Sequence, residues 1–369
     1  MKQNSDQRTR KIVYTICGIL LGVLLAYSIG YKFPSTFQET ITKIEKDVTV
    51  TDEGIADAVE KVYDSVIVVS TYKDDSLYSS GSGFVYKIDD KTSYIITNYH
   101  VIADGTSYKV TYTDGQVVNA ESLGADQYAD IAVLKVKTKE NIKAVEIGST
   151  ESLRVGDTTF TVGAPLDDAY SWTVTRGIIS GKERLVEVAI NANDSNYVMN
   201  VLQTDAAVNS GNSGGPLSNS NGEVIGVISA KISSTGVEGI GFAIPIETAI
   251  ERAEQIINGE ASEYPYLGVS MYNVSDAIND PRYYPSIREL DKYTGVLVAD
   301  VQKNSPAYKA KLEAGDVIIE LNDKKVDNVA FLRYELYKYH VGDKIEIKFI
   351  RDGKQKTVEV KLESSLPTS

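Results

Sequence analysis

Hydrophobic positions in this chain gather in short runs of β-branched residues, which polar, turn-forming pairs separate. Runs of this kind follow one another between residues 65 and 246, and the pairs between them include Asp104-Gly105, Asp114-Gly115 and Asn221-Gly222. Such runs are typical of β-strands, and Asp-Gly and Asn-Gly favour tight turns. Strands this short and this regularly spaced predict a mainly β region, built as a barrel or a sandwich.

Helical patterns interrupt the strands at few places. Thr51-Asp52 has the composition of a helix start, and apolar residues follow it at helical spacing up to Val62. Glu247–Ile257 predicts one amphipathic helix, which Asn258-Gly259 closes. We place a domain boundary there, because the remainder mixes strands with a short helix near Asn328–Tyr339 and has the size of one small domain.

The N-terminal part has a different pattern, an uncharged run of 20 residues from Ile12 to Tyr31. About 20 apolar residues in a helix span the roughly 30 Å core of a bilayer. Basic residues, among them Arg10 and Lys11, precede the run, so the positive-inside rule places the N-terminus in the cytoplasm. A cleaved signal peptide ending near Ala26-Tyr27-Ser28 is the alternative, although its apolar part would be unusually long.

The expected organisation is a single-pass membrane protein with both folded domains outside the cytoplasm. Its predicted parts are a cytoplasmic tail at 1–11, a transmembrane helix at 12–31, a tether at 32–51, a first domain at 52–259 and a second domain at 264–362.

Composition removes several classes of function. Of the 369 residues, 42% are hydrophobic and 24% charged, which is typical of a globular chain. The net charge of −13 argues against a nucleic-acid binder, which would show a basic face. One Cys and two His exclude internal disulfides and His/Cys zinc sites, and we expect no metal.

The segment from Gly211 to Leu217 (GNSGGPL) carries the sharpest chemical signal. Its glycines can present the hydroxyl of Ser213 on a tight turn and direct backbone N–H groups inward as an oxyanion hole. A glycine-rich surface turn is the plain alternative. The string also fits the nucleophile elbow of α/β-hydrolases, but that motif needs a helix next and a histidine downstream. Here Asn221-Gly222 and another strand follow, and the one downstream histidine, His340, lies in the other domain.

The order histidine, aspartate, serine fits instead. His100 is the histidine of the first domain and is expected at the end of a strand. Asp130 enters an apolar strand, where a partly buried carboxylate could orient an imidazole. Asp126 lies in the preceding turn and is the weaker candidate. Each residue alone has an ordinary structural explanation, and their joint presence is what predicts a catalytic triad.

At this point the sequence resembles the HtrA (Deg) family of serine proteases over roughly residues 52–362. The resemblance rests on the blocks 97–102, 130–134, 203–217 and 239–245. It implies a mainly β fold in which a chymotrypsin-like double β-barrel is followed by a PDZ domain. It also implies His100, Asp130 and Ser213 as the triad, the amides of Gly211 and Ser213 as oxyanion donors, a homotrimer and no cofactor.

The same resemblance extends to two binding sites. In this fold the S1 specificity pocket would be formed by Ala207, Val208, Ile228 and Ala230. In the second domain, Tyr266, Leu267, Gly268 and Val269 resemble the loop with which PDZ domains bind a peptide carboxylate. The expected function is ATP-independent endopeptidase activity on unfolded or damaged proteins outside the membrane, modulated by the PDZ domain. The alternative is a chaperone or PDZ-based sensor with a vestigial protease site.

Overall fold

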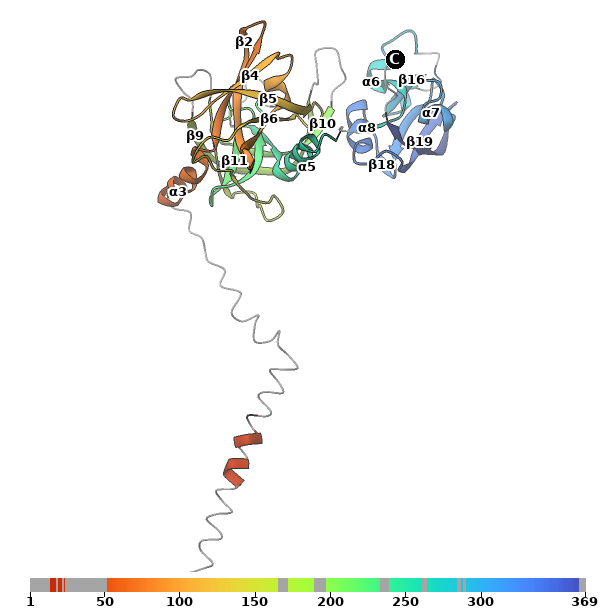
Figure 1. The fold of residues 1–369 in the computed structure, drawn as a ribbon. Coiled ribbons are helices and arrows are strands. Elements are labelled where there is room, and N and C mark those ends of the chain that lie inside the picture. Colours follow the sequence, from red (N-terminus) through yellow and green to blue (C-terminus); the bar gives the residue numbers. More distant parts are fainter. Residues whose placement is uncertain are drawn as a thin grey trace, which may run out of the picture. The chain divides into compact units, whose positions relative to one another are not determined.

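The computed structural model describes residues 14–17, 19–21, 23, 52–164, 172–188, 197–232, 239–260, 264–283, 287 and 290–364 (Figure 1). The chain divides into two units between Thr49 and Val50, and each is described by itself. In the described residues, no helix is long and apolar enough to cross a membrane. The predicted tail, the whole predicted tether and most of the predicted span at 12–31 lie outside the described residues.

The first barrel closes on itself with the strand order β1-β2-β3-β6-β5-β4. All of its neighbouring strands pair antiparallel. Its strands are β1 (Val66–Lys73), β2 (Ser76–Asp89), β3 (Thr92–Thr97), β4 (Ser107–Thr111), β5 (Val117–Asp126) and β6 (Ile131–Lys137). Closure removes the free sheet edges that short β-strands would otherwise expose.

The second barrel has the order β11-β8-β9-β10-β13-β12, and pairing of β11 with β12 closes the ring. The short strand β7 adds to β12 in parallel. Its strands are β7 (Glu146–Ile147), β8 (Thr158–Gly163), β9 (Thr173–Val188), β10 (Tyr197–Thr204), β11 (Pro216–Asn219), β12 (Glu223–Ile228) and β13 (Gly241–Pro245). The expectation of a mainly β, double-barrel domain is confirmed.

The largest buried cluster joins the two barrels. Phe84 of β2 and Phe160 of β8 are fully buried in it, together with residues of both predicted helices. These helices are confirmed as α3 (Asp52–Tyr63) and α5 (Ile246–Ile257). Trp172 also packs on this cluster and donates its indole N–H to the carbonyl oxygen of Val66, 3.0 Å away. The contact between the barrels is therefore a continuous hydrophobic core.

A separate core fills the C-terminal domain. Its main sheet has the order β15-β16-β17-β19-β20, in which β15 (Val269–Asn273) is an edge strand. The predicted helix near residues 328–339 is observed as α8 (Val329–Leu336), and Asn328 caps it by accepting from the N–H of Phe331. The other elements are β14 (Pro265–Tyr266), α6 (Val274–Ala277), η2 (Leu290–Lys292), β16 (Val296–Val301), α7 (Pro306–Lys309), β17 (Val317–Leu321), β18 (Lys324–Lys325), β19 (Lys344–Arg351), β20 (Lys354–Lys361) and β21 (Glu363–Ser364).

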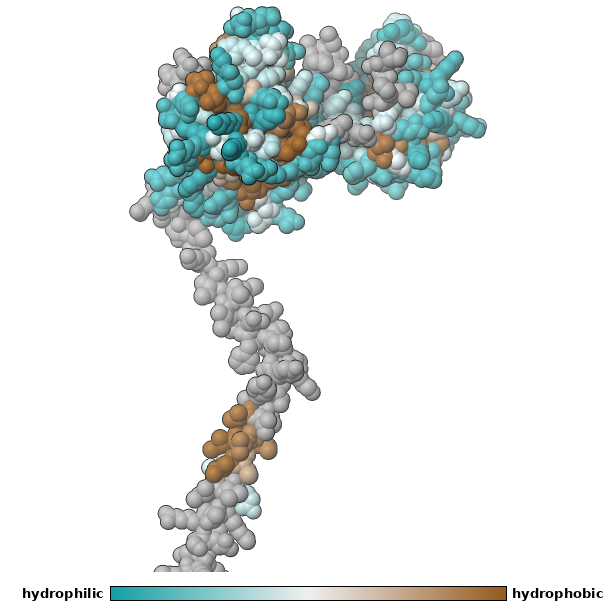
Figure 2. Space-filling model, viewed as in Figure 1, coloured by the Kyte–Doolittle hydropathy of each residue, from teal (hydrophilic) through white to brown (hydrophobic). Residues whose placement is uncertain are grey.

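The two units differ in the hydropathy of their exposed residues. The visible face of the folded domains is mostly hydrophilic, with smaller hydrophobic areas between (Figure 2). In the N-terminal unit, the described helical residues at 14–23 expose large apolar side chains, such as Ile19 at 63% and Leu21 at 65% of their surface. Single exposed apolar residues are ordinary on a folded domain. It is unusual there for all the described large side chains of a helical segment to be apolar and exposed.

Candidate active site

His100 and Asp130 form the centre of the candidate site. The imidazole Nδ1 lies 2.9 Å from both carboxylate oxygens of Asp130. The side chain of Asp130 is only 7% exposed and that of His100 is 24% exposed. An ionised carboxylate only accepts hydrogen bonds, so Nδ1 carries the proton. In the neutral ring, Nε2 then has a free lone pair and can act as a base.

The sequence predicted His100 at the end of a strand. It lies instead in the one-turn helix α4 (Tyr99–Ile102), which follows β3. The first N–H groups of a helix lack partners within the helix. Here the backbone N–H of His100 donates to Asp130 Oδ1 at 3.1 Å. The aspartate therefore binds the histidine through its backbone and its ring, which fixes both the position and the orientation of the imidazole.

The backbone of Asp130 is held in an uncommon conformation. Its φ of +53° lies in the left-handed region, which costs energy for residues other than glycine. The side-chain amide of Asn98 donates to the carbonyl oxygen of Asp130 at 2.8 Å, and the hydroxyl of Ser229 donates to its Oδ2 at 2.9 Å. The buried carboxylate thus accepts from three donors, which are the backbone N–H and the ring Nδ1–H of His100 and the hydroxyl of Ser229.

Ser213 lies in a loop that the first barrel holds in place. Its carbonyl oxygen accepts from the N–H of Ser82, and the hydroxyl of Ser82 donates to the carbonyl oxygen of Gly211 at 2.7 Å. Gly214 has a φ of +85°, and a Cβ there would lie 2.1 Å from the carbonyl oxygen of Ser82. A glycine is required at that position by conformation and by space.

The loop leaves two backbone donors free at the serine. Within the described part of the chain, the N–H groups of Gly211 and Ser213 donate to no partner, whereas those of Asn212, Gly214 and Gly215 are all bonded. Gly211 itself has a φ of +100°. Two free N–H groups flanking one residue can bind an oxygen that becomes negatively charged.

Two consecutive residues connect the serine with the His–Asp pair. Ser229 binds Asp130, and the N–H of the next residue, Ala230, donates to the hydroxyl oxygen of Ser213 at 3.0 Å. The structure thereby brings the three predicted triad residues to one place at the junction of the two barrels.

The predicted S1 residues occupy different environments. Ala207 is exposed, Val208 and Ala230 are partly buried, and Ile228 is fully buried in the core of the second barrel. The carbonyl oxygen of Ala207 accepts from the side-chain amide of Asn212, next to the serine. Ile228 therefore supports this region from within the core.

The predicted PDZ loop connects β14 with β15. Gly268 has a φ of +77°, and a Cβ there would lie 2.2 Å from that of Ser305. The carbonyl oxygens of Leu267 and Gly268 are occupied by the N–H groups of Ala307 and Gln302. Their own N–H groups donate to no described residue. Tyr266 and Val269 flank them in β14 and β15.

Sequence reasoning missed the residues that support the triad, namely Asn98, Ser229 and Ser82. Ser82 had a usable signal, because glycines flank it inside a strand, where glycine often marks close approach of another backbone. In the described residues, no group of three or more His, Cys, Asp or Glu side chains could hold a metal ion.

Both domains are similar to those of known proteins. A family model of the trypsin-like peptidase domain matches residues 81–227, and one of the PDZ domain matches residues 265–362. The serine protease Do-like HtrA of Bacillus subtilis is 38% identical over 340 residues, covering 90% of this chain and 74% of that protein. The chain belongs to the HtrA family of serine proteases.

Further relatives agree. The serine protease Do-like HtrA of Lactococcus lactis is 34% identical over 84% of this chain and 83% of its own length. Among solved structures, the HtrA-type protease AlgW with a decapeptide matches with a TM-score of 0.64 at 28% identity, covering 85% of this chain and 99% of that one. The serine endoprotease from Yersinia pestis matches with a TM-score of 0.63 at 29% identity, over 84% and 97%. This HtrA-family chain is a serine endopeptidase.

The bond from Ser229 to Asp130 generates a first prediction. Ser229→Ala should lower kcat/KM on a short chromogenic peptide by about tenfold, because a hydrogen bond to a charged group is lost. Ser93→Ala is the matched control, since Ser93 is a buried serine whose hydroxyl bonds to Thr138 at 3.0 Å, on another part of the barrel. Equal activity of the two variants would show that the Ser229 bond does not support catalysis.

Proposed function

We propose that His100, Asp130 and Ser213 are the catalytic triad of this endopeptidase. The observation that carries the proposal is the Asp130–His100 pair, which the consecutive residues Ser229 and Ala230 connect to the hydroxyl of Ser213. The hydroxyl oxygen of Ser213 attacks the peptide carbonyl while Nε2 takes its proton. Nε2 then delivers the proton to the leaving amine as the C–N bond breaks. Water releases the acyl group by the same steps, and Asp130 stabilises the imidazolium throughout.

The free N–H groups of Gly211 and Ser213 are proposed as the oxyanion hole. They would bind the carbonyl oxygen as it acquires charge, and one such donor typically contributes about 2.7–4 kcal/mol to the transition state. Ala207, Val208 and Ala230 are the proposed lining of the S1 pocket, and the fully buried Ile228 supports them from the core. Their side chains offer no charge, which favours a small aliphatic side chain in the substrate.

The proposed substrates are unfolded or damaged proteins, degraded without ATP in protein quality control and the response to stress. Membership of the HtrA family supports this proposal. A chaperone or sensor with a vestigial site is the alternative. The three donors on the Asp130 carboxylate favour an enzyme, because a buried charge and a left-handed backbone are costly to maintain without use.

The PDZ domain is proposed to bind the C-terminus of a peptide. The free N–H groups of Leu267 and Gly268 can receive a carboxylate, and the edge strand β15 can pair with the peptide backbone. Bound peptide would then favour the competent form of the protease loops, which is a coupling between two sites.

We also propose that residues 12–31 anchor the protein in the cytoplasmic membrane, with the N-terminus inside. The uncharged run, the basic residues before it and the exposed apolar side chains of its described part support this. Assembly as a homotrimer, implied by the family, belongs to the same proposal, and sedimentation of the full-length chain in detergent tests it.

The nucleophile is tested with Ser213→Ala. We expect the full-length wild-type chain to degrade β-casein without added ATP and the variant to lose this activity, because no other group replaces the attacking oxygen. Circular dichroism of the two proteins, recorded without casein, checks that both are folded. Degradation at equal rates by both proteins would mean that Ser213 is not the nucleophile.

Peptide activation is tested on a short chromogenic substrate. A hydrophobic peptide with a free C-terminus should raise the rate by roughly 5- to 150-fold, the range of typical couplings. The same peptide with a C-terminal amide is the matched control, because it lacks the carboxylate. If the free-acid peptide binds and the rate does not change, the PDZ domain only tethers substrates.

The anchor is tested by fractionation of cells that express the full-length chain. The protein should remain in the membrane pellet after alkaline carbonate washing, since a spanning helix resists extraction. A chain that starts at residue 33 should be released. Recovery of the full-length protein as a shortened, soluble form would favour the cleaved signal peptide.

A further inference from the structure

Asp126 is a second buried carboxylate near the triad, and nothing in the proposed chemistry uses it. It is the last residue of β5, four positions before Asp130, and its side chain has no exposed surface. Burial of a carboxylate is costly unless hydrogen bonds and a counter-charge compensate it. The partners of Asp126 therefore indicate its role.

One oxygen of Asp126 shapes the turn that leads to the catalytic aspartate. Asp126 Oδ1 accepts from the backbone N–H of Tyr128 at 2.9 Å and from that of Ala129 at 3.0 Å. Aspartate commonly closes turns by accepting from backbone groups a few residues further on. Here the turn ends directly at Asp130, whose left-handed φ persists only if its surroundings hold it.

The other oxygen of Asp126 binds a residue far away in the sequence. The hydroxyl of Tyr264 donates to Oδ2 at 2.5 Å, and Nε of Arg252 from α5 lies 3.6 Å from the same oxygen. Burial raises the pKa of Tyr264, and the charge of Asp126 raises it further, so the hydroxyl stays protonated and donates. Tyr264 follows the predicted first domain at 52–259 and lies directly before the matched PDZ region, which begins at residue 265.

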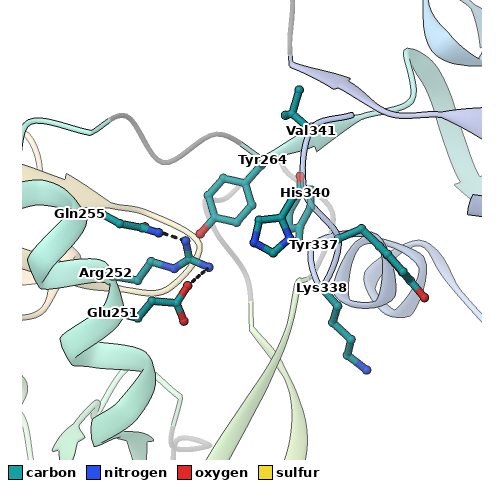
Figure 3. A pocket seen from close by; sticks show the side chains of 9 residues that line it. Glu251, Arg252, Gln255, Tyr264, Tyr337, Lys338, His340 and Val341 are labelled. Carbon is teal, nitrogen blue, oxygen red and sulfur yellow. Dashed lines mark hydrogen bonds and ion pairs between the residues drawn. The ribbon is translucent and has the colours of Figure 1, made fainter. Parts of the chain in front are cut away.

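Tyr264 packs against other aromatic rings and also lines a cavity. Its ring meets that of Tyr128 edge-on, with centroids 4.8 Å apart, and Tyr128 also contacts Tyr337 at the end of α8. On another side, Tyr264 and Arg252 line a cavity of about 580 Å³, in which the hydroxyl of Tyr264 points at the guanidinium (Figure 3). The ring also meets that of Tyr337, with centroids 4.6 Å apart, and the Arg252 guanidinium lies 5.6 Å from the centroid of the Tyr264 ring. This packing and the bond to Asp126 together set the position of Tyr264.

We propose that Asp126 and Tyr264 are positioning residues for the catalytic aspartate. The hydroxyl of Tyr264 and the cation of Arg252 hold the Asp126 carboxylate, and this carboxylate holds the turn that presents Asp130 to His100. The proposal rests on the proposed role of Asp130 in the triad. It assigns to the segment that joins the two domains a direct part in aligning the active site.

The test is Tyr264→Phe, which removes only the hydroxyl. We expect about tenfold lower kcat on a short chromogenic peptide with KM within about twofold, because the substrate contacts remain and the base is misaligned. The rate of labelling of Ser213 by a fluorophosphonate should fall by a similar factor. Tyr86→Phe is the matched control, since its hydroxyl donates to Glu254 on α5 at 2.9 Å without contacting the turn.

A second pair of variants separates alignment from stability. Asp126→Asn keeps an acceptor for the two backbone N–H groups and should resemble Tyr264→Phe, whereas Asp126→Ala should lose more activity. Adding Tyr264→Phe to Asp126→Asn should cause little further loss in kcat, because the two groups act through one bond. If Asp126→Ala does not fold, Tyr264→Phe alone decides.

The outcomes distinguish this proposal from the proposed function. Tyr264→Phe with the same kcat and labelling rate as Tyr86→Phe overturns the positioning role. The same holds if its kcat loss only follows a lower melting temperature and disappears on cooling. In either case the triad stands as long as Ser213→Ala is inactive, whereas an active Ser213→Ala variant overturns the triad itself.

Discussion

The site depends on one buried carboxylate, that of Asp130, and on what it binds. It accepts from the backbone and the ring of His100 and from the hydroxyl of Ser229. A carboxylate with this set of donors cannot rotate without leaving one of them unpaired, which is costly in a buried site. The imidazole therefore has one orientation before substrate arrives. Such preorganisation lowers the reorganisation that the reaction would otherwise require.

The same requirement explains the two-barrel arrangement. His100 and Asp130 come from the first barrel, whereas Ser213 comes from the second. Their relative position is set by the core between the barrels and by bonds across it, such as those of Ser82 to the Ser213 loop. Each barrel alone carries only part of the proposed triad. Catalysis then requires that the barrels do not slide past each other, and a continuous, closely packed core prevents this.

The features predicted from the sequence are those with a local signal. Turn pairs and β-branched runs predicted the strands, and spacing predicted α3 and α5, because both patterns arise from neighbouring residues. The candidate triad was predicted because the first domain has one histidine and because glycines flank Ser213. The partners of Asp130 were not predicted, since Asn98 and Ser229 are ordinary residues whose roles depend on long-range contacts. The bond between Asp126 and Tyr264 was not predicted either, because the two residues are 138 positions apart and the pairing has no local signal.

The contact of Trp172 with Val66 has a practical consequence. Trp172 is the single tryptophan of the chain, and its indole lies half-buried against the core between the barrels. Intrinsic tryptophan fluorescence of this protein is therefore a local gauge of that junction. Its emission will change when the barrels separate, even while each keeps its strands. Unfolding confined to the PDZ domain will leave the emission unchanged.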